Sequence, residues 1–131
     1  MCVLSAPRSD GTIAASVVNA GVLEHPLTGD PVVGFVARGL RKLDHLRVDP
    51  RATIVARAGS RWVAVEGAAD IFGPEDPHPD VDSERLRLLL RDVFVAAGGA
   101  HDDWETYDRV MVDERSAAVL IVPRRSYTIP A

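Results

Sequence analysis

Apolar residues recur along the chain in short runs, several of them alternating with polar residues, and this pattern predicts β-strands. The runs cover residues 1–7, 12–20, 31–37, 51–58, 61–71, 116–123 and 125–129. The run at 31–37 is almost unbroken, as expected of a strand that is buried on both faces. The turn sequence RSDG at 8–11 joins the first two runs and predicts a hairpin. Gly67, inside the fifth run, predicts a bulge or the close approach of another segment.

A short basic helix is predicted directly after the unbroken run. Its apolar positions recur every third residue, at Leu40, Leu43 and Leu46. The pair Asp49-Pro50 ends it, because the residue before a proline is pushed out of the helical region. Arg41 and Lys42 then lie in the first turn, where cations oppose the helix dipole. A bound anion would reverse this argument, since unpaired N–H groups and two cations form a phosphate site. The alternative is two solvated charges on an exposed helix.

Two further helices are predicted in the second half of the chain. Residues 83–97 have apolar positions at helical spacing, and Gly98-Gly99 ends that helix. A second, shorter helix is predicted to open at Asp102, which forms a pattern resembling a capping box with Glu105. Trp104, Tyr107 and Met111 form its apolar side, which is interpreted as part of the hydrophobic core in preference to a binding site.

The predicted order is strand–strand–strand–helix–strand–strand–helix–helix–strand. Strands joined by tight turns favour an antiparallel sheet that closes into a barrel, with flanking helices, over a doubly wound parallel sheet. Residues 21–30 and the acidic, proline-rich residues 74–82 are predicted loops. With 131 residues and no internal repeat or linker, residues 1–131 are expected to form a single domain.

Composition narrows the class of protein. The net charge of -4 argues against a general nucleic-acid binder. The one cysteine, Cys2, excludes an internal disulfide framework and a cysteine zinc site, and it is interpreted as a small hydrophobic residue. No apolar run is long enough to span a bilayer, and the chain begins at a strand without a leader, so a cytoplasmic protein is expected.

No sequence motif supplies a catalytic group of its own. The chain has no G-x-S-x-G, H-E-x-x-H, P-loop or G-x-G-x-x-G motif. The four histidines (His25, His45, His78 and His101) are scattered without metal-ligand spacing, so no metal is predicted. His25 and His78 are interpreted as ordinary surface residues and His45 as a solvated side chain on the basic helix. If the protein is an enzyme, a bound cofactor must therefore carry the reaction.

The sequence FVARGLRK at 35–42, followed by DPRA at 49–52 and RWVAVEG at 61–67, resembles the FMN-binding split-barrel superfamily of pyridoxamine phosphate oxidase. Within it, the pattern is most similar to the deazaflavin-dependent reductases of subgroup B, an actinobacterial group that uses coenzyme F420. The resemblance covers nearly the whole chain. It implies a six-stranded antiparallel split barrel that forms a homodimer, with cofactor sites at the subunit interface.

The resemblance also implies a set of cofactor-binding residues. The basic pair Arg41 and Lys42 would hold the cofactor phosphate, and the ring would lie along the strand before it and against the preceding strand. The residues implied are Phe35, Val36, Ala37, Gly39, Arg41, Lys42, Ser16, Val17 and Asn19. The sequence departs from the pattern of this family at two places. It has no helix before the first strand, and it has Leu40 at a position where family members often have a polar or basic residue. Candidates to dock the glutamate tail of F420 are Arg38, Arg47 and Arg51.

The activity implied is transfer of a hydride from reduced F420 to a small, electron-poor, lipophilic substrate, such as an activated C=C bond or a quinone. No catalytic residue is assigned. Three alternatives stay open: an FMN-dependent oxidoreductase on the same fold, a module that binds a flavin or haem without turnover, and a structural dimer whose basic helix binds nothing. Phosphate-binding residues do not separate F420 from FMN, because both carry a ribityl phosphate.

Overall fold

The computed structural model describes residues 1–38 and 41–129, except for the side chains of Arg41, Lys42 and Ile129. Its elements, in chain order, are β1 (Cys2–Pro7), β2 (Ile13–Val18), β3 (Ala20–Glu24), β4 (Pro31–Ala37), α1 (Arg41–Val48), β5 (Arg51–Ala58), β6 (Arg61–Phe72), α2 (Ser83–Ala96), α3 (Trp104–Asp113) and β7 (Ala117–Ile129). No helix in these ranges is both long and apolar enough to cross a membrane.

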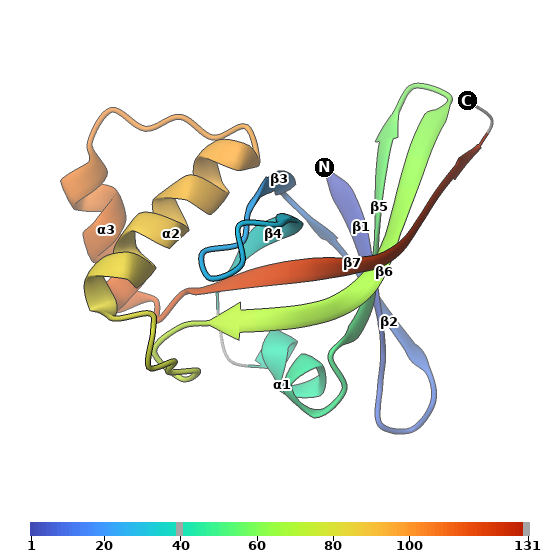
Figure 1. Ribbon diagram of the computed structural model, residues 1–131, viewed down its shortest axis with the longest axis horizontal. Coiled ribbons are helices and arrows are strands. Elements are labelled where there is room, and N and C mark those ends of the chain that lie inside the picture. Colours follow the sequence, from blue (N-terminus) through green and yellow to red (C-terminus); the bar gives the residue numbers. More distant parts are fainter. Residues whose placement is uncertain (39–40, 130–131) are drawn as a thin grey trace.

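The strands form one antiparallel sheet in the order β2-β1-β5-β6-β7-β4-β3 (Figure 1). Its two edge strands, β2 and β3, are consecutive in the chain and only Asn19 lies between them. The sheet therefore curls until its edges are joined by the chain itself, and this closure leaves a barrel interior. The predicted mainly β fold, an antiparallel barrel with flanking helices, is confirmed.

The expected number of six strands is wrong, because the sheet has seven among the described residues. The run at 12–20 was expected to form one strand, but β2 ends at Val18 and the chain bends at Asn19. Ala20–Glu24, most of which lies in the predicted loop 21–30, then pairs with β4. Gly21 lets this strand lie against the end of α2, since a Cβ at Gly21 would collide with the carbonyl oxygen of Ala96. Loop composition alone did not reveal that pairing.

The sheet separates two hydrophobic cores, and β4 contributes to both. Phe35 is 2% exposed and points into the barrel interior, whereas Val32 is 1% exposed and packs under α2 and α3. The prediction that residues 31–37 form a strand buried on both faces is confirmed. Figure 1 shows α2 and α3 together on one side, while the opposite half of the barrel is uncovered.

The longest strand, β7, replaces two predicted strands at 116–123 and 125–129. It runs through Pro123, which lies opposite Gly67 at a register shift between β6 and β7. A Cβ at Gly67 would collide with the carbonyl oxygen of Val122, so the glycine permits this close approach. The bulge predicted at Gly67 is confirmed.

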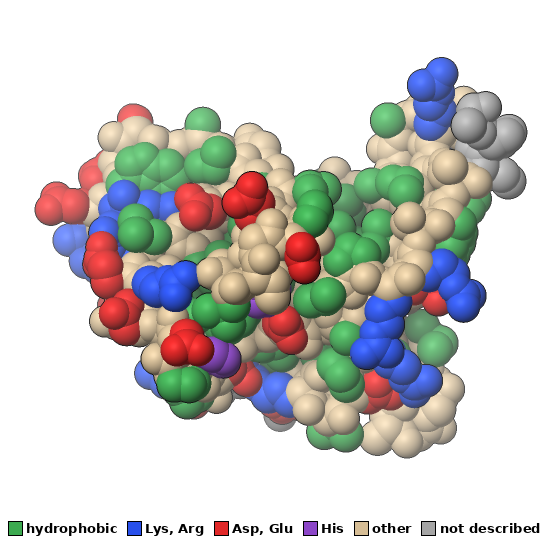
Figure 2. Space-filling model, in the orientation of Figure 1, with side chains coloured by type: hydrophobic (Ala, Val, Ile, Leu, Met, Phe, Trp, Pro, Cys, Tyr) green, Lys and Arg blue, Asp and Glu red, His purple; other side chains and the backbone are tan. Residues whose placement is uncertain are grey.

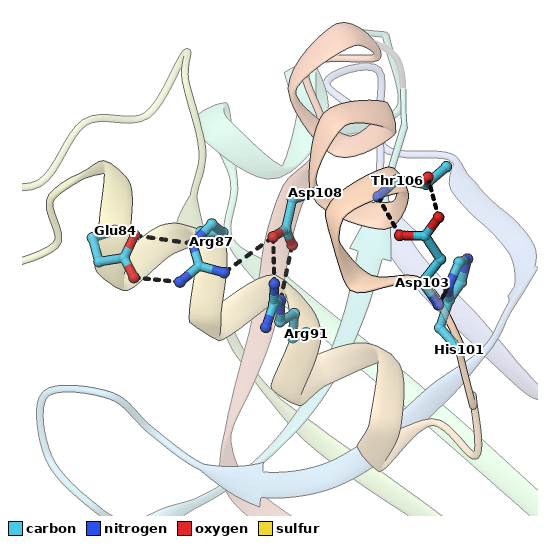
Figure 3. Close-up of polar contacts among 7 residues, drawn as sticks. All are labelled: Glu84, Arg87, Arg91, His101, Asp103, Thr106 and Asp108. Carbon is cyan, nitrogen blue, oxygen red and sulfur yellow. Dashed lines mark hydrogen bonds and ion pairs between the residues drawn. The ribbon is translucent and has the colours of Figure 1, made fainter.

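An aspartate caps the N-terminus of each of the two later helices, and the cap of α3 differs from the predicted one. Asp82 caps α2, with its carboxylate accepting from the Arg85 N–H at 2.8 Å. The cap of α3 is Asp103 and not Asp102, because Asp103 accepts from the Thr106 N–H at 3.1 Å (Figure 3). The N–H of Asp103 in turn donates to Nδ1 of His101 at 3.0 Å, which fixes the start one residue later than expected.

Candidate functional site

The pleat of β2 and β4 divides the residues expected to bind the cofactor ring between two faces. Val17 and Val36 point away from the barrel interior, and Asn19 lies at the bend beside them. Phe35 and Ala37 point into the barrel core, where they are 2% and 4% exposed. Ser16, opposite the buried Leu4 in the sheet, faces the same interior. The side chains that can reach a ligand from outside the barrel are therefore Val17, Asn19 and Val36.

These three residues line one hollow of about 580 Å³ at the corner between β2 and β3. Arg38, directly after β4, lines it too. The other walls come from the end of α2, the glycines after it and α3, and they include Phe94, Gly98, Gly99, Tyr107 and Met111. We call this hollow the corner pocket. Tyr107 and Met111 were assigned to the core from their helical spacing, and they are indeed only 5% and 3% exposed. Their second role, as walls of a pocket, depends on how α3 packs and had no signal in the sequence.

The expected phosphate-binding pair begins the helix that follows this pocket. Arg38 lines the pocket at the end of β4, and Arg41 and Lys42 are the first residues of α1. Gly39 and Leu40 lie outside the described residues, as do the side chains of Arg41 and Lys42. Arg41 therefore follows the pocket residue Arg38 by three positions in the sequence, in the order of elements that was predicted.

Tyr107 is the titratable side chain most deeply set in the corner pocket. Its hydroxyl donates to the carbonyl oxygen of Leu90 at 2.8 Å. Burial raises the pKa of Tyr107 to about 12. The phenol thus stays protonated at neutral pH with its proton committed to the backbone, which suits a structural wall better than an acid or base.

The wall formed by α2 and α3 is held by a network of ion pairs (Figure 3). Asp108 on α3 accepts from Nε of Arg91 at 2.9 Å and from Nη1 of Arg87 at 3.0 Å, both on α2. Arg87 also pairs with Glu84, one turn earlier on α2. Hydrogen bonds from Arg91, ahead of those from Arg87, lower the pKa of Asp108 against the opposing effect of burial. The guanidinium of Arg91 lies 5.2 Å from the ring centre of Trp104, which joins the two helices a second time.

A larger groove of about 1300 Å³ lies beside the last turn of α1 and the β1–β2 hairpin. Its basic residues are Arg8, Arg51, Arg124 and Arg125, and its acidic residues are Asp44, Asp49 and Glu66. Figure 2 shows basic side chains gathered over the barrel strands, on the side of the molecule away from α2 and α3. This groove contains none of the expected ring-binding residues, so the smaller corner pocket is the better candidate for the ring.

The three arginines considered for the F420 tail each have a carboxylate partner. Arg38 pairs with Glu114 at 3.1 Å, Arg47 with Asp76 at 2.8 Å and Arg51 with Asp49 at 2.7 Å. An anionic tail would have to compete with these carboxylates.

His25 was interpreted as a surface residue, and this is wrong. It is 5% exposed, with Nε2 2.9 Å from Oδ2 of Asp70 and Nδ1 accepting from the Leu27 N–H at 3.1 Å. Because Nδ1 accepts, Nε2 carries the proton and donates to Asp70. The ring also contacts Phe72 edge-on, so the loop after β3 is folded onto β6. Both nitrogens are committed, and His25 fixes this loop without offering a base to a ligand.

Comparison with known proteins supports the fold. No family model matches the chain. A conserved hypothetical protein of Mycobacterium tuberculosis is 22% identical, with a TM-score of 0.69 over 97% of this chain and 74% of that one. A pyridoxamine 5'-phosphate oxidase-related, FMN-binding protein of Nostoc punctiforme is 14% identical, with a TM-score of 0.66 over 97% and 73%. A Clostridium acetobutylicum protein of the pyridoxinephosphate oxidase family is 9% identical, with a TM-score of 0.60 over 97% and 77%. The chain thus shares the fold of these split-barrel proteins.

Among the described residues, no three His, Cys, Asp or Glu side chains gather in a way that could hold a metal ion.

Proposed function

We propose that the protein is an oxidoreductase that binds coenzyme F420, with the cofactor ring at the corner pocket and its phosphate at the first turn of α1. The observation that carries the proposal is the meeting of Val17, Asn19 and Val36 around one pocket that Arg38 also lines, three residues before the basic helix α1 begins in the sequence. The choice of F420 rests on the sequence resemblance. The proposed substrate is a small, electron-poor, lipophilic molecule with an activated C=C bond or a quinone ring.

The residues present fit such a cofactor. The pocket volume of about 580 Å³ lies within the roughly 300–1,000 Å³ usual for ligand sites. Most of its lining residues are apolar, but polar atoms, including the Asn19 amide and the Arg38 guanidinium, form the larger part of its exposed lining. The first N–H groups of α1 have no partner within the helix, and with the two cations of Arg41 and Lys42 they suit a phosphate.

When bound, a reduced deazaflavin supplies a hydride. The chain supplies the surroundings: Val17 and Val36 give apolar walls that exclude water, and Asn19 offers an amide donor and acceptor to a ring edge. Since the Tyr107 proton is committed to the carbonyl oxygen of Leu90, no proton-donating role is proposed for Tyr107. Binding, orientation and water exclusion are the roles proposed for these residues.

FMN is the second candidate cofactor, and the name of the Nostoc neighbour as FMN-binding favours it. It would make the protein an FMN-dependent oxidoreductase of the pyridoxamine phosphate oxidase type. A flavin- or haem-binding module without turnover would show tight binding but no acceleration of hydride transfer.

The test is fluorescence titration of the apoprotein with F420 and, separately, with FMN. We expect low-micromolar or tighter binding of F420 and weaker binding of FMN. Arg41→Ala and Lys42→Ala should each weaken binding about tenfold or more, because each removes a charged hydrogen bond to the phosphate. Arg109→Ala, an exposed arginine on α3, is the control and should change nothing. Preference for FMN would move the cofactor assignment to FMN, and binding of neither would overturn the proposal.

We also propose that residues 1–131 form one domain and that two copies pair as a homodimer. The uncovered outer face of the barrel carries an apolar row across five strands, in register, formed by Val17, Val3, Val55, Ala64 and Tyr127. Val17, Val3 and Tyr127 are 59%, 44% and 43% exposed, whereas Ala64 between them is only 2% exposed; exposed apolar side chains gathered on one face favour contact with a second copy. Analytical ultracentrifugation should show a dimer that Val3→Asp converts to monomer, and a monomeric wild type would refute the pairing.

A further inference from the structure

One ion pair ties the proposed anion-binding helix to the rest of the protein. Nε of Arg47 on α1 donates to Oδ1 of Asp76 at 2.8 Å, and Nη2 donates to Oδ2 at 2.8 Å. Their side chains are 26% and 18% exposed, so water screens this pair less than it screens the exposed pairs elsewhere on the surface. Two parallel hydrogen bonds between planar groups fix orientation as well as distance.

Apart from this ion pair, the described side chains of α1 contact the rest of the protein mainly along one apolar side of the helix. The helix has eight residues, too few to be stable alone, and it packs on the barrel core through Leu43 and Leu46. Of the α1 side chains that the structure describes, Arg47 is the one that forms hydrogen bonds to another part of the chain. Contacts at Leu43 and Leu46 limit how far α1 can separate from the barrel but leave its rotation about its axis less restricted.

Asp76 is itself fixed to the sheet. Its N–H donates to the carbonyl oxygen of Gly73 at 3.0 Å, in a tight turn directly after β6. Gly73 packs so closely on β7 that a Cβ there would lie 2.7 Å from Cβ of Ala117. The contacts therefore lead from the sheet through Gly73 and Asp76 to Arg47, and from Arg47 along about 9 Å of helix to Arg41.

We propose that Asp76 is a positioning residue, which through Arg47 sets the rotation of α1 and so directs its first turn toward the cofactor phosphate. This inference rests on the proposed function, because it takes the first turn of α1 as the anion site. Asp76 lies in the acidic loop 74–82, outside both the corner pocket and the predicted set of binding residues.

The experiment compares cofactor dissociation constants for wild type, Asp76→Asn and Glu75→Gln, with FMN and F420 as the probes. Asp76→Asn removes the charge and one acceptor at constant size and should weaken binding about tenfold. Glu75→Gln is the matched control: Glu75 is the neighbouring acid on the same loop, but it pairs with Arg115 at the end of α3, so binding should stay within twofold of wild type. Equal binding by wild type and Asp76→Asn would overturn the inference.

A double-mutant cycle separates positioning from general loss of stability. In a background that carries both Arg41→Ala and Lys42→Ala, the effect of Asp76→Asn should fall to about twofold, since both cations that Asp76 positions are already gone. An undiminished tenfold effect in that background would show a general structural role and overturn the inference. If Asp76→Asn fails to fold, the swap of Arg47→Asp with Asp76→Arg tests the same pair, and recovery of binding over Arg47→Asp alone is expected.

A readout without cofactor distinguishes the two proposals. Hydrogen exchange of the α1 amides should be faster in Asp76→Asn than in wild type and unchanged in Glu75→Gln. If wild type binds neither cofactor, the proposed function fails even where α1 exchange responds. If wild type binds and α1 exchange does not respond to Asp76→Asn, the positioning role fails and the proposed function stands.

Discussion

Replacing Asp108 by Asn tests whether the joint between α2 and α3 rests on charge. The Asp108 carboxylate receives two hydrogen bonds from Arg91 and one from Arg87. Asparagine keeps the size of the side chain but removes the negative charge and one acceptor oxygen. Because α3 carries Tyr107 and Met111, the same joint also holds one wall of the corner pocket.

The expected loss follows from the partial burial of the network. Asp108 is 16% exposed, whereas Arg91 and Arg87 are 25% and 34% exposed. Fully exposed ion pairs contribute about 0–1 kcal/mol, and hydrogen bonds to charged groups that are withdrawn from water contribute roughly 1.5–3 kcal/mol. We therefore expect Asp108→Asn to lower the free energy of unfolding by about 2 kcal/mol. For a chain of this length that corresponds to a fall in Tm of roughly 7 °C.

The effect should depend on pH in a defined direction. The pKa of Asp108 is lowered from its ordinary value of 3.8 in the folded protein, mainly by the Arg91 hydrogen bonds. A lowered pKa means that the carboxylate stabilises the fold above that ordinary value and loses its contribution as the pH falls through the folded pKa. The difference between wild type and Asp108→Asn should be constant near pH 7 and should shrink below about pH 4.

Urea unfolding of both proteins at a series of pH values measures this difference. Glu84→Gln is the matched control, since Glu84 belongs to the same network but its side chain is 63% exposed. Glu84→Gln should lower the free energy of unfolding much less than Asp108→Asn does. An equal loss from the two variants, or a difference that persists unchanged in acid, would refute the reasoning that a partly buried charge holds the helices together.

Three other perturbations have expected outcomes. Gly21→Ala should lower the free energy of unfolding in urea by more than about 2 kcal/mol, because its Cβ would collide with the backbone of Ala96. An unchanged free energy of unfolding would contradict that packing. Burial raises the pKa of Tyr107 to about 12, so the contribution of the protonated phenol to the free energy of unfolding should persist below pH 10 and be lost as the pH rises toward 12. Absorbance titration should find the Tyr107 phenol ionising near pH 12, and its ionisation near pH 10 would be inconsistent with burial. Phe35→Leu should lower stability by about 1 kcal/mol while leaving cofactor affinity unchanged, because Phe35 faces the core, and a large affinity loss would place it at the site.

Local pattern predicted most of the elements of this fold. The unbroken apolar run at 31–37 became β4 with the expected bounds, and its burial on both faces follows from having few polar side chains to hydrate. Asp49-Pro50 ended α1, as predicted, because a residue before proline leaves the helical region. Each of these depends on residues within a few positions of one another.

The errors lie where distant segments decide the outcome. Residues 21–24 were assigned to a loop because Pro26, Gly29 and Asp30 follow them, yet they belong to β3, since β4 offers hydrogen bonds and α2 packs on the backbone at Gly21. His25 can be buried because Asp70, 45 positions away, accepts a hydrogen bond from its ring. Neither partner can be identified from the sequence around the residue it affects.

The candidate site shows the same division. From the sequence alone came the barrel with flanking helices, the position of a basic helix after a buried strand, and the expectation that a cofactor would carry any chemistry. The pleat of β2 and β4 decided that Val17 and Val36 face the corner pocket while Phe35 and Ala37 face the core. The packing of α3 brought Tyr107 to the same pocket, and the fold of the acidic loop brought Asp76 to α1. Periodicity along one strand or helix predicts which residues share a face. Which other segments that face contacts is determined only by the packing of the whole chain.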